Sequence, residues 1–205
     1  VLRQSGVIRA RSLREMLEFA RALPILPAPK GDNIVIITGA GGSGVLLSDA
    51  VVDNGLSLMA MPSDLDTAFR KFIPPFGASG NPVDITGGEP PKTYQNTIRL
   101  GLEDPRIHSL VLGYWHTIIT PPMVFAKLVA EVVEEMKAKG ISKPIVASLA
   151  GDVEVEEAAE YLFDHGVPAY PYSTEMPVAV LGAKYRWARG AGAMPKASPS
   201  EAPSR

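Results

Sequence analysis

The residues with the clearest chemical potential are the glycine-rich segment GAGGSG at positions 39–44. It follows an apolar, β-branched run at 34–37 and precedes an amphipathic segment that ends at Gly55. This order predicts a strand, a tight loop and a helix. The first N–H groups of a helix have no partner within it and lie at the positive end of its dipole. The sequence therefore predicts a site for a phosphate or another anion where this helix begins.

The loop also has three interpretations other than an anion site. Gly39, Gly41 and Gly44 also satisfy G-x-G-x-x-G, but a dinucleotide site needs an acidic residue at the end of the second strand. The second apolar run ends in LMAMP, and Asp64 falls beyond Pro62 at an expected helix start. No Gly-Lys-Ser/Thr follows, which excludes a Walker loop. The remaining alternative is structural, with glycines that only allow the strand and the helix to pack tightly.

The composition excludes several classes of function. The chain has 205 residues, of which 46% are hydrophobic and 20% charged, with a net charge of -2 and no cysteine. No basic stripe and no apolar run of about 20 residues occurs, so neither a nucleic-acid nor a membrane partner is predicted. The lack of cysteine excludes disulfides and thiolate ligands, and no His, Asp or Glu cluster has metal-binding spacing. A cytoplasmic location is the resulting expectation.

The elements that must position the loop alternate between strands and helices. Strands are expected at 34–37, 56–61, 107–114, 144–149 and 167–170, with helices at 13–23, 42–55, 63–74, 92–102, 121–139, 153–164 and 174–189. The strands are apolar throughout, which is typical of a parallel sheet covered on both faces. We therefore predict a flavodoxin-like, doubly wound α/β domain with a five-stranded parallel sheet. Ligands bind such sheets at the carboxyl ends of the strands.

Both ends of the chain differ from this regular core. The chain begins at Val1 without an initiator methionine, and residues 1–31 are expected to be a helix and linker from a preceding domain. The core is expected to span 32–190. Residues 191–205 are rich in Pro, Ser and Ala, which predicts a disordered tail. The chain is therefore expected to be a piece of a larger protein.

Two motifs in order suggest a family. The segment ITGAGGSGVLLSDAVVDNGL at 37–56, followed by GNPVD at 80–84, resembles the ADP-forming (NDP-forming) acyl-CoA synthetases, relatives of succinyl-CoA synthetase. The likeness is to the CoA-ligase-like third domain of their α portion, and it extends from RQSGVIRARSLREMLEFARAL to about Arg189. The resemblance thus implies a succinyl-CoA synthetase-like domain.

The resemblance also implies a reaction. Members of the family convert acid, CoA and ATP into acyl-CoA, ADP and phosphate through an acyl phosphate and a phosphorylated histidine. Carried over to this chain, the backbone N–H groups of Gly41, Gly42, Ser43 and Gly44 would contact the phosphate of the phosphohistidine. Many relatives have Asn-Ala-Gly-Gly-Pro-Gly at this loop, whereas this chain has GAGGSG.

The family's phosphorylated histidine lies in a Ser-His-Thr-Gly-type loop that would precede Val1, so no catalytic residue is expected in this chain. The chain alone is then expected to be inactive and to hold no cofactor or metal. The parent protein would use CoA and ATP/ADP with Mg²⁺, through CoA-binding, phosphohistidine and ATP-grasp domains. The alternative is a non-catalytic, regulatory synthetase-like domain of a protein acetyltransferase.

Further polar residues are weaker candidates. Asn81 and Asp84 lie in an expected loop at 77–88, where Asp84 is more simply explained as accepting backbone N–H bonds than as contacting substrate. His116 follows the third expected strand and either touches an anionic intermediate or is an ordinary, partly buried histidine. His165 is expected at a helix C-terminus and His108 on the surface.

An excised domain should leave an apolar interface exposed. The candidates near the carboxyl ends of the strands are Tyr114, Trp115, Pro121, Pro122 and Phe125. Such a surface also predicts self-association of the isolated chain.

Overall fold

A computed structural model describes residues 7–193 of the chain. The strands are β1 (Ile34–Thr38), β2 (Val83–Asp84), β3 (Ser109–Trp115), β4 (Ile145–Ala150) and β5 (Ala169–Pro171). The helices are α1 (Leu13–Ala22), α2 (Gly41–Asp53), α3 (Ser63–Arg70), α4 (Pro91–Glu103), α5 (Pro122–Ala138), α6 (Glu154–Asp164) and α7 (Glu175–Gly190). Of the predicted tail at 191–205, the part from residue 194 lies outside the described residues, as do residues 1–6 of the predicted N-terminal segment.

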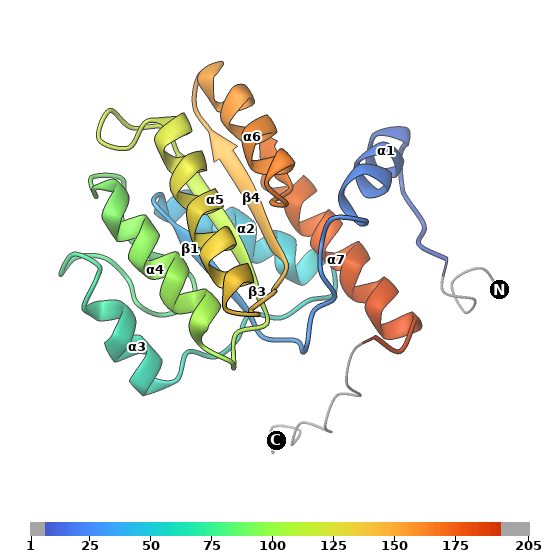
Figure 1. Cartoon of the computed structure of the whole chain (residues 1–205), viewed down its shortest axis with the longest axis horizontal. Coiled ribbons are helices and arrows are strands. Elements are labelled where there is room, and N and C mark those ends of the chain that lie inside the picture. The colour runs from blue at the N-terminus through green and yellow to red at the C-terminus, as the bar shows by residue number, and fades with distance from the viewer. Residues whose placement is uncertain (1–6, 194–205) are drawn as a thin grey trace.

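Within residues 7–193, five parallel strands form one sheet in the order β2-β1-β3-β4-β5. Helices cover both faces, with α4 and α5 in front of the sheet and α2 behind it (Figure 1). Every residue of β1 is buried, because Val35 and Ile37 belong to the core under α3–α6 while Ile34 and Ile36 belong to the core under α1, α2 and α7. The predicted doubly wound parallel sheet is therefore confirmed.

The second strand is not where the sequence predicts it. The run expected as a strand at 56–61 contributes a single parallel bridge, between Leu58 and Ile34. Instead, β2 lies inside the segment expected to be a loop, and it pairs with the last two residues of β1. The edge of β1 is therefore shared by two short segments that are distant in the sequence.

The side chain of Asn81 fills the gap between these two segments. Its Oδ1 accepts a hydrogen bond from the N–H of Ile36 at 3.0 Å, and its Nδ2 donates to the carbonyls of Ile34 and Met59 at 2.8 and 3.0 Å. Because a side-chain amide carries the same donor and acceptor as a peptide, Asn81 replaces one residue of the missing strand. Apolar periodicity does not report such a bridge.

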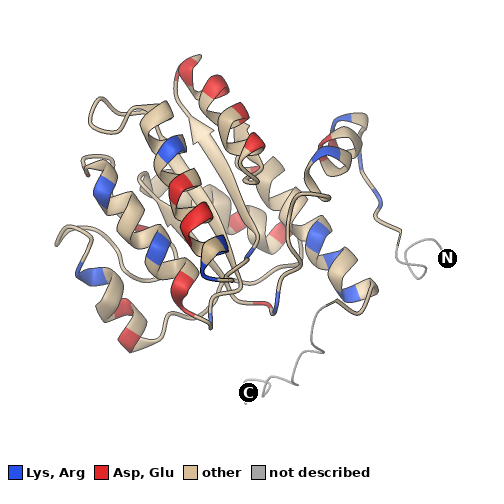
Figure 2. Cartoon of the chain, in the orientation of Figure 1, with Lys and Arg blue, Asp and Glu red and all other residues tan. Residues whose placement is uncertain are grey.

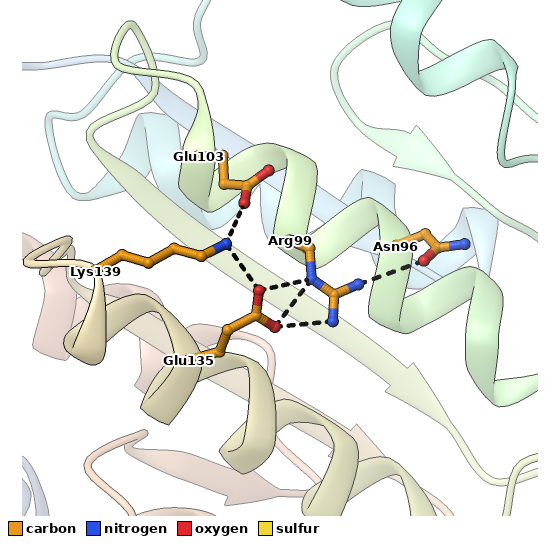
Figure 3. Close-up of polar contacts among 5 residues, drawn as sticks. All are labelled: Asn96, Arg99, Glu103, Glu135 and Lys139. Atoms are coloured by element: carbon orange, nitrogen blue, oxygen red, sulfur yellow. Dashed lines mark hydrogen bonds and ion pairs between the residues drawn. The ribbon is translucent and has the colours of Figure 1, made fainter.

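A charged network joins the outer faces of α4 and α5. Glu135 of α5 accepts hydrogen bonds from the guanidinium of Arg99 on α4, and Lys139 donates to both Glu135 and Glu103 at 2.8 Å (Figure 3). Arg99 also donates to Asn96 one turn earlier. These contacts help to set the position of α4, whose first turn lies at the carboxyl edge of the sheet.

Among residues 7–193, no helix combines the length and the apolar character needed to cross a membrane.

Candidate anion-binding site

The glycine loop connects β1 directly to α2. The Thr38 hydroxyl accepts a hydrogen bond from the N–H of Ala40 and donates to the carbonyl of the same residue, both at 3.0 Å. Ala40 is the N-cap residue, and no side chain caps the helix. The N–H of Gly44 donates to the Ala40 carbonyl at 3.0 Å as the first intrahelical bond. Of the four N–H groups predicted to contact the phosphate, those of Gly41, Gly42 and Ser43 have no hydrogen-bond partner among the described residues.

The structure requires glycine at some positions of the loop but not at others. A Cβ at Gly39 would overlap the hydroxyl of Tyr94, and one at Gly44 would come within 3.1 Å of Thr38 Cγ2, so tight packing explains both positions. A Cβ at Gly42 would meet nothing within 4 Å. Open space therefore lies beside Gly42, an exposed residue in the first turn of α2. The packing alternative accounts for part of the motif but not for Gly42.

The pairing of β2 with β1 places Asp84 beside the glycine loop. A Cβ at Gly41 would lie 2.8 Å from Asp84 Oδ2, so the carboxylate stands beside the first residue of α2. Its Oδ1 accepts the N–H of Thr86 at 2.9 Å, where the chain turns with a positive φ of 65° at Thr86. This bond supports the interpretation that Asp84 holds its own loop. A direct contact of Asp84 with a ligand stays a prediction.

Asn81 lies further from the loop than sequence proximity to Asp84 indicates. Its three side-chain hydrogen bonds all go to the backbone of residues 34, 36 and 59. Ile34 begins β1, whereas the glycine loop follows its last residue. With a rise of about 3.3 Å per residue, these ends of the strand are more than 10 Å apart. The geometry therefore assigns Asn81 to the edge of the sheet.

His116 lies at the carboxyl edge, between β3 and β4. Its backbone N–H donates to the Ala150 carbonyl at 2.8 Å, and its Nε2 is 3.6 Å from Glu154 Oε2 at the start of α6. Gly151 allows this approach, because a Cβ there would lie 2.5 Å from His116 Cβ. The imidazole is thus engaged with an acidic residue, and its contact with an anionic intermediate stays a prediction.

The other two histidines are structural. His165 caps the C-terminus of α6, where its ring stacks on Tyr161 at 4.1 Å, in agreement with the expected helix end. The expectation that His108 is exposed is wrong. Its Nδ1 accepts the N–H of Asn33 at 3.1 Å, and burial lowers the pKa of its imidazole.

Of the residues predicted to form an exposed apolar patch, only some are at the surface. Trp115 is 54% exposed and Pro121 is also at the surface, but Tyr114, Pro122 and Phe125 are buried. The reason is that Tyr114 faces α5, where its ring stacks on that of Phe125 with centroids 4.4 Å apart.

Two residues absent from that prediction are exposed beside Trp115. Ile118 is 97% exposed and Ile119 is 53% exposed. The loop that contains them, after β3, carries no Lys, Arg, Asp or Glu (Figure 2). We use the term apolar rim for Trp115, Ile118, Ile119 and Pro121.

Sequence reasoning missed Tyr94. It belongs to the first turn of α4, and with Ile98 and Leu102 it forms the buried stripe of that helix. Helices in this fold begin at the carboxyl edge of the sheet, and side chains tilt toward the helix N-terminus. A tyrosine at the start of such a stripe therefore presents its hydroxyl to the ligand edge, and this signal was available in the sequence.

Within residues 7–193, no group of three or more His, Cys, Asp or Glu residues is placed to hold a metal ion. No Lys or Arg occurs between positions 31 and 69, so the sequence around the loop contributes backbone donors rather than cations. Preorganised N–H donors suit an oxyanion, because they need no reorganisation when the charge arrives.

Comparison with known proteins identifies the domain. Residues 34–195 match the model of the Ligase-CoA domain. The chain is 40% identical over 187 residues to the acetate–CoA ligase [ADP-forming] I subunit alpha of Pyrococcus furiosus, a match that covers 91% of this chain and 39% of the relative. The chain thus spans about two fifths of the length of that relative.

Solved structures agree. The apo form of the dinucleotide-forming acetyl-coenzyme A synthetase 1 of Ca. Korarchaeum cryptofilum superposes with a TM-score of 0.86 at 33% identity, covering 93% of this chain and 41% of that one. The same protein in complex with phosphate and ADP gives a TM-score of 0.86 at 32% identity, covering 93% of this chain and 40% of that one. Together with the five-stranded sheet and its glycine loop, these matches show that the chain belongs to the Ligase-CoA domain family.

Proposed function

We propose that this chain is the phosphoryl-binding domain of an ADP-forming acyl-CoA synthetase. The observation that carries the proposal is the uncapped start of α2 at the carboxyl edge of the sheet, where three N–H groups have no partner among the described residues and Gly42 borders open space. The family match and the similarity to acetate–CoA ligase alpha subunits support this assignment.

In the proposed reaction, an oxygen of inorganic phosphate attacks the thioester carbonyl of acyl-CoA and the CoA thiolate leaves, which gives an acyl phosphate. A histidine nitrogen then takes the phosphoryl group and releases the carboxylate. ADP finally accepts the phosphoryl group from the phosphohistidine and becomes ATP. The reverse direction forms acyl-CoA from acid, CoA and ATP.

This chain would bind the phosphohistidine rather than carry it. The N–H groups of Gly41, Gly42 and Ser43 would donate to phosphoryl oxygens, and the dipole of α2 would stabilise their negative charge. Neutral donors suit a group that must be released again, because they stabilise charge without a permanent ion pair. The histidine, the CoA site and the nucleotide site with its Mg²⁺ would come from other domains of the parent protein.

The surface around the site fits such partners. The apolar rim lies at the same edge of the sheet as the glycine loop, and Val45 and Leu46 in the first turns of α2 are also exposed. We propose that this surface packs against the domains that bring CoA and the phosphohistidine to the loop.

The decisive experiment uses the full-length parent protein. It is incubated with acyl-CoA and ³²P-phosphate and assayed for acid-labile, base-stable label. Gly42→Pro removes one N–H donor, and proline is tolerated in the first turn of a helix. Gly42→Ala is the matched control, because it keeps the N–H and its Cβ meets open space.

We expect the label to be lost in Gly42→Pro and retained in Gly42→Ala, with both variants folded by circular dichroism. If a well-folded wild-type protein takes no label, the proposed function is wrong and a regulatory relative is favoured. If Gly42→Pro labels as well as the wild type, the loop does not hold the phosphoryl group.

A further inference from the structure

Tyr94 is a buried polar residue at the glycine loop for which the fold alone gives no polar role. Its side chain is 3% exposed, and its ring packs edge-on against Phe125 with centroids 5.2 Å apart. The hydroxyl end points away from this aromatic cluster toward Gly39, where a Cβ would overlap the hydroxyl oxygen and come within 2.9 Å of Cζ. Glycine at position 39 therefore makes room for this hydroxyl at the end of β1.

The hydroxyl of Tyr94 has no hydrogen-bond partner among the described residues. Among the other buried tyrosines, Tyr114 donates to the Thr120 carbonyl at 2.6 Å and Tyr185 shares a 2.8 Å bond with Ser109, whereas the fully buried hydroxyl of Tyr170 has no partner among the described residues. The ring of Tyr94 is buried, whereas its hydroxyl oxygen is not one of the fully buried unpaired atoms and is therefore accessible at this edge. The hydroxyl at position 94 is thus available to a partner that is not part of this domain.

The hydroxyl of Tyr94 stays protonated and can therefore donate a hydrogen bond. Burial, and then the neighbouring Tyr114 and Asp84, raise the pKa of Tyr94 far above its ordinary value. The group is therefore a neutral O–H at any physiological pH. It can approach the Asp84 carboxylate and a phosphoryl group without adding a second negative charge.

The hydroxyl and the free amides face the same edge. Tyr94 contacts Gly39, while Asp84 stands at Gly41, two residues further along the chain. The Cα atoms of Gly39 and Gly41 are at most about 7.6 Å apart, since consecutive Cα atoms are separated by 3.8 Å. The Tyr94 hydroxyl and the helix amides are therefore close enough to contact one phosphoryl group.

We propose that Tyr94 is a further binding residue of this site, and that its O–H donates a hydrogen bond to an oxygen of the phosphoryl group held at Gly41, Gly42 and Ser43. The inference rests on the proposed function and adds a side-chain donor to a site otherwise built from backbone.

The test measures how strongly the full-length protein holds its phosphoryl group. Protein is equilibrated with mixtures of labelled ATP and ADP, and the ratio of phosphorylated to free enzyme is measured at each nucleotide ratio. Tyr94→Phe removes only the hydroxyl. Tyr170→Phe is the matched control, because that tyrosine is 5% exposed and its hydroxyl is also unpartnered, but it lies on β5 at the opposite edge of the sheet from β2.

We expect the phosphorylated-to-free ratio to fall about tenfold or more in Tyr94→Phe, as for the loss of a hydrogen bond to a charged group. The ratio should not change in Tyr170→Phe. Thermal melting should show Tyr94→Phe to be about as stable as the wild type, because the hydroxyl makes no hydrogen bond within the described residues, so a purely structural effect would be visible.

Each alternative result is distinguishable. An unchanged ratio in Tyr94→Phe, with label that still depends on the Gly42 N–H, overturns the role of Tyr94 and leaves the proposed function intact. Equal losses in Tyr94→Phe and Tyr170→Phe also overturn it. If the wild-type protein takes no label at all, the proposed function fails and this inference fails with it.

Discussion

Replacing Asn81 with alanine tests how the edge of the sheet is built. In the structure, this side chain makes three hydrogen bonds, to Ile36 N–H and to the carbonyls of Ile34 and Met59. Both β1 residues are fully buried. The Ile34 carbonyl keeps a second partner, the N–H of Met59 at 3.0 Å, whereas the Ile36 N–H has no other partner among the described residues on this edge.

The magnitude follows from these contacts. A net 0.5–1.5 kcal/mol for each hydrogen bond gives a loss of about 1.5–4.5 kcal/mol, and the unpaired Ile36 N–H favours the middle of this range or above. We therefore expect Asn81→Ala to lower the free energy of unfolding by about 3 kcal/mol. For a domain of this length, the melting temperature should then fall by roughly 6–12 °C.

The assay is urea and thermal unfolding of the chain, with Asn96→Ala as the control. Asn96 makes a single long side-chain bond, to Arg99 at 3.4 Å, so its loss should cost less than about 0.5 kcal/mol. A cost below about 1 kcal/mol for Asn81→Ala would refute the edge role argued from these bonds. A folded Asn81→Ala parent protein with greatly reduced phosphoenzyme would instead show that Asn81 contacts the ligand.

Two further predictions concern packing and charge. Gly39→Ala should destabilise the domain by about 1–3 kcal/mol, because its Cβ would overlap the Tyr94 hydroxyl, whereas Gly42→Ala meets no atom and should change stability by less than about 0.5 kcal/mol in urea unfolding. Arg99, and then Lys139, lower the pKa of Glu135 to about 2. Because this pKa is depressed in the folded state, the stability that Glu135 contributes is present above its ordinary value of 4.5 and is lost as the pH falls toward 2. The difference in melting temperature between wild type and Glu135→Gln should therefore shrink over that interval; a difference that stays constant with pH would contradict the assignment.

The backbone part of the candidate site could be predicted from the sequence. Strand, glycine loop and helix start are local features, so the open N–H groups of Gly41, Gly42 and Ser43 follow from the sequence order. The role of Gly39 does not, because its reason is a tyrosine on α4 that is distant in the chain. The same holds for Asp84, whose position beside Gly41 depends on how β2 pairs with β1.

The sequence by itself determined the fold class and the location of the loop. Runs of β-branched residues, helical periodicity and glycines act over a few neighbouring positions, so their effects can be recognised without knowing the rest of the chain. Tertiary structure decided which segment became the second strand, that Tyr114 and Phe125 are core rather than interface, and that Tyr94 reaches the loop. These outcomes depend on competition between segments for the same edge or the same buried volume. Such competition is settled only when all of the packed elements are present together.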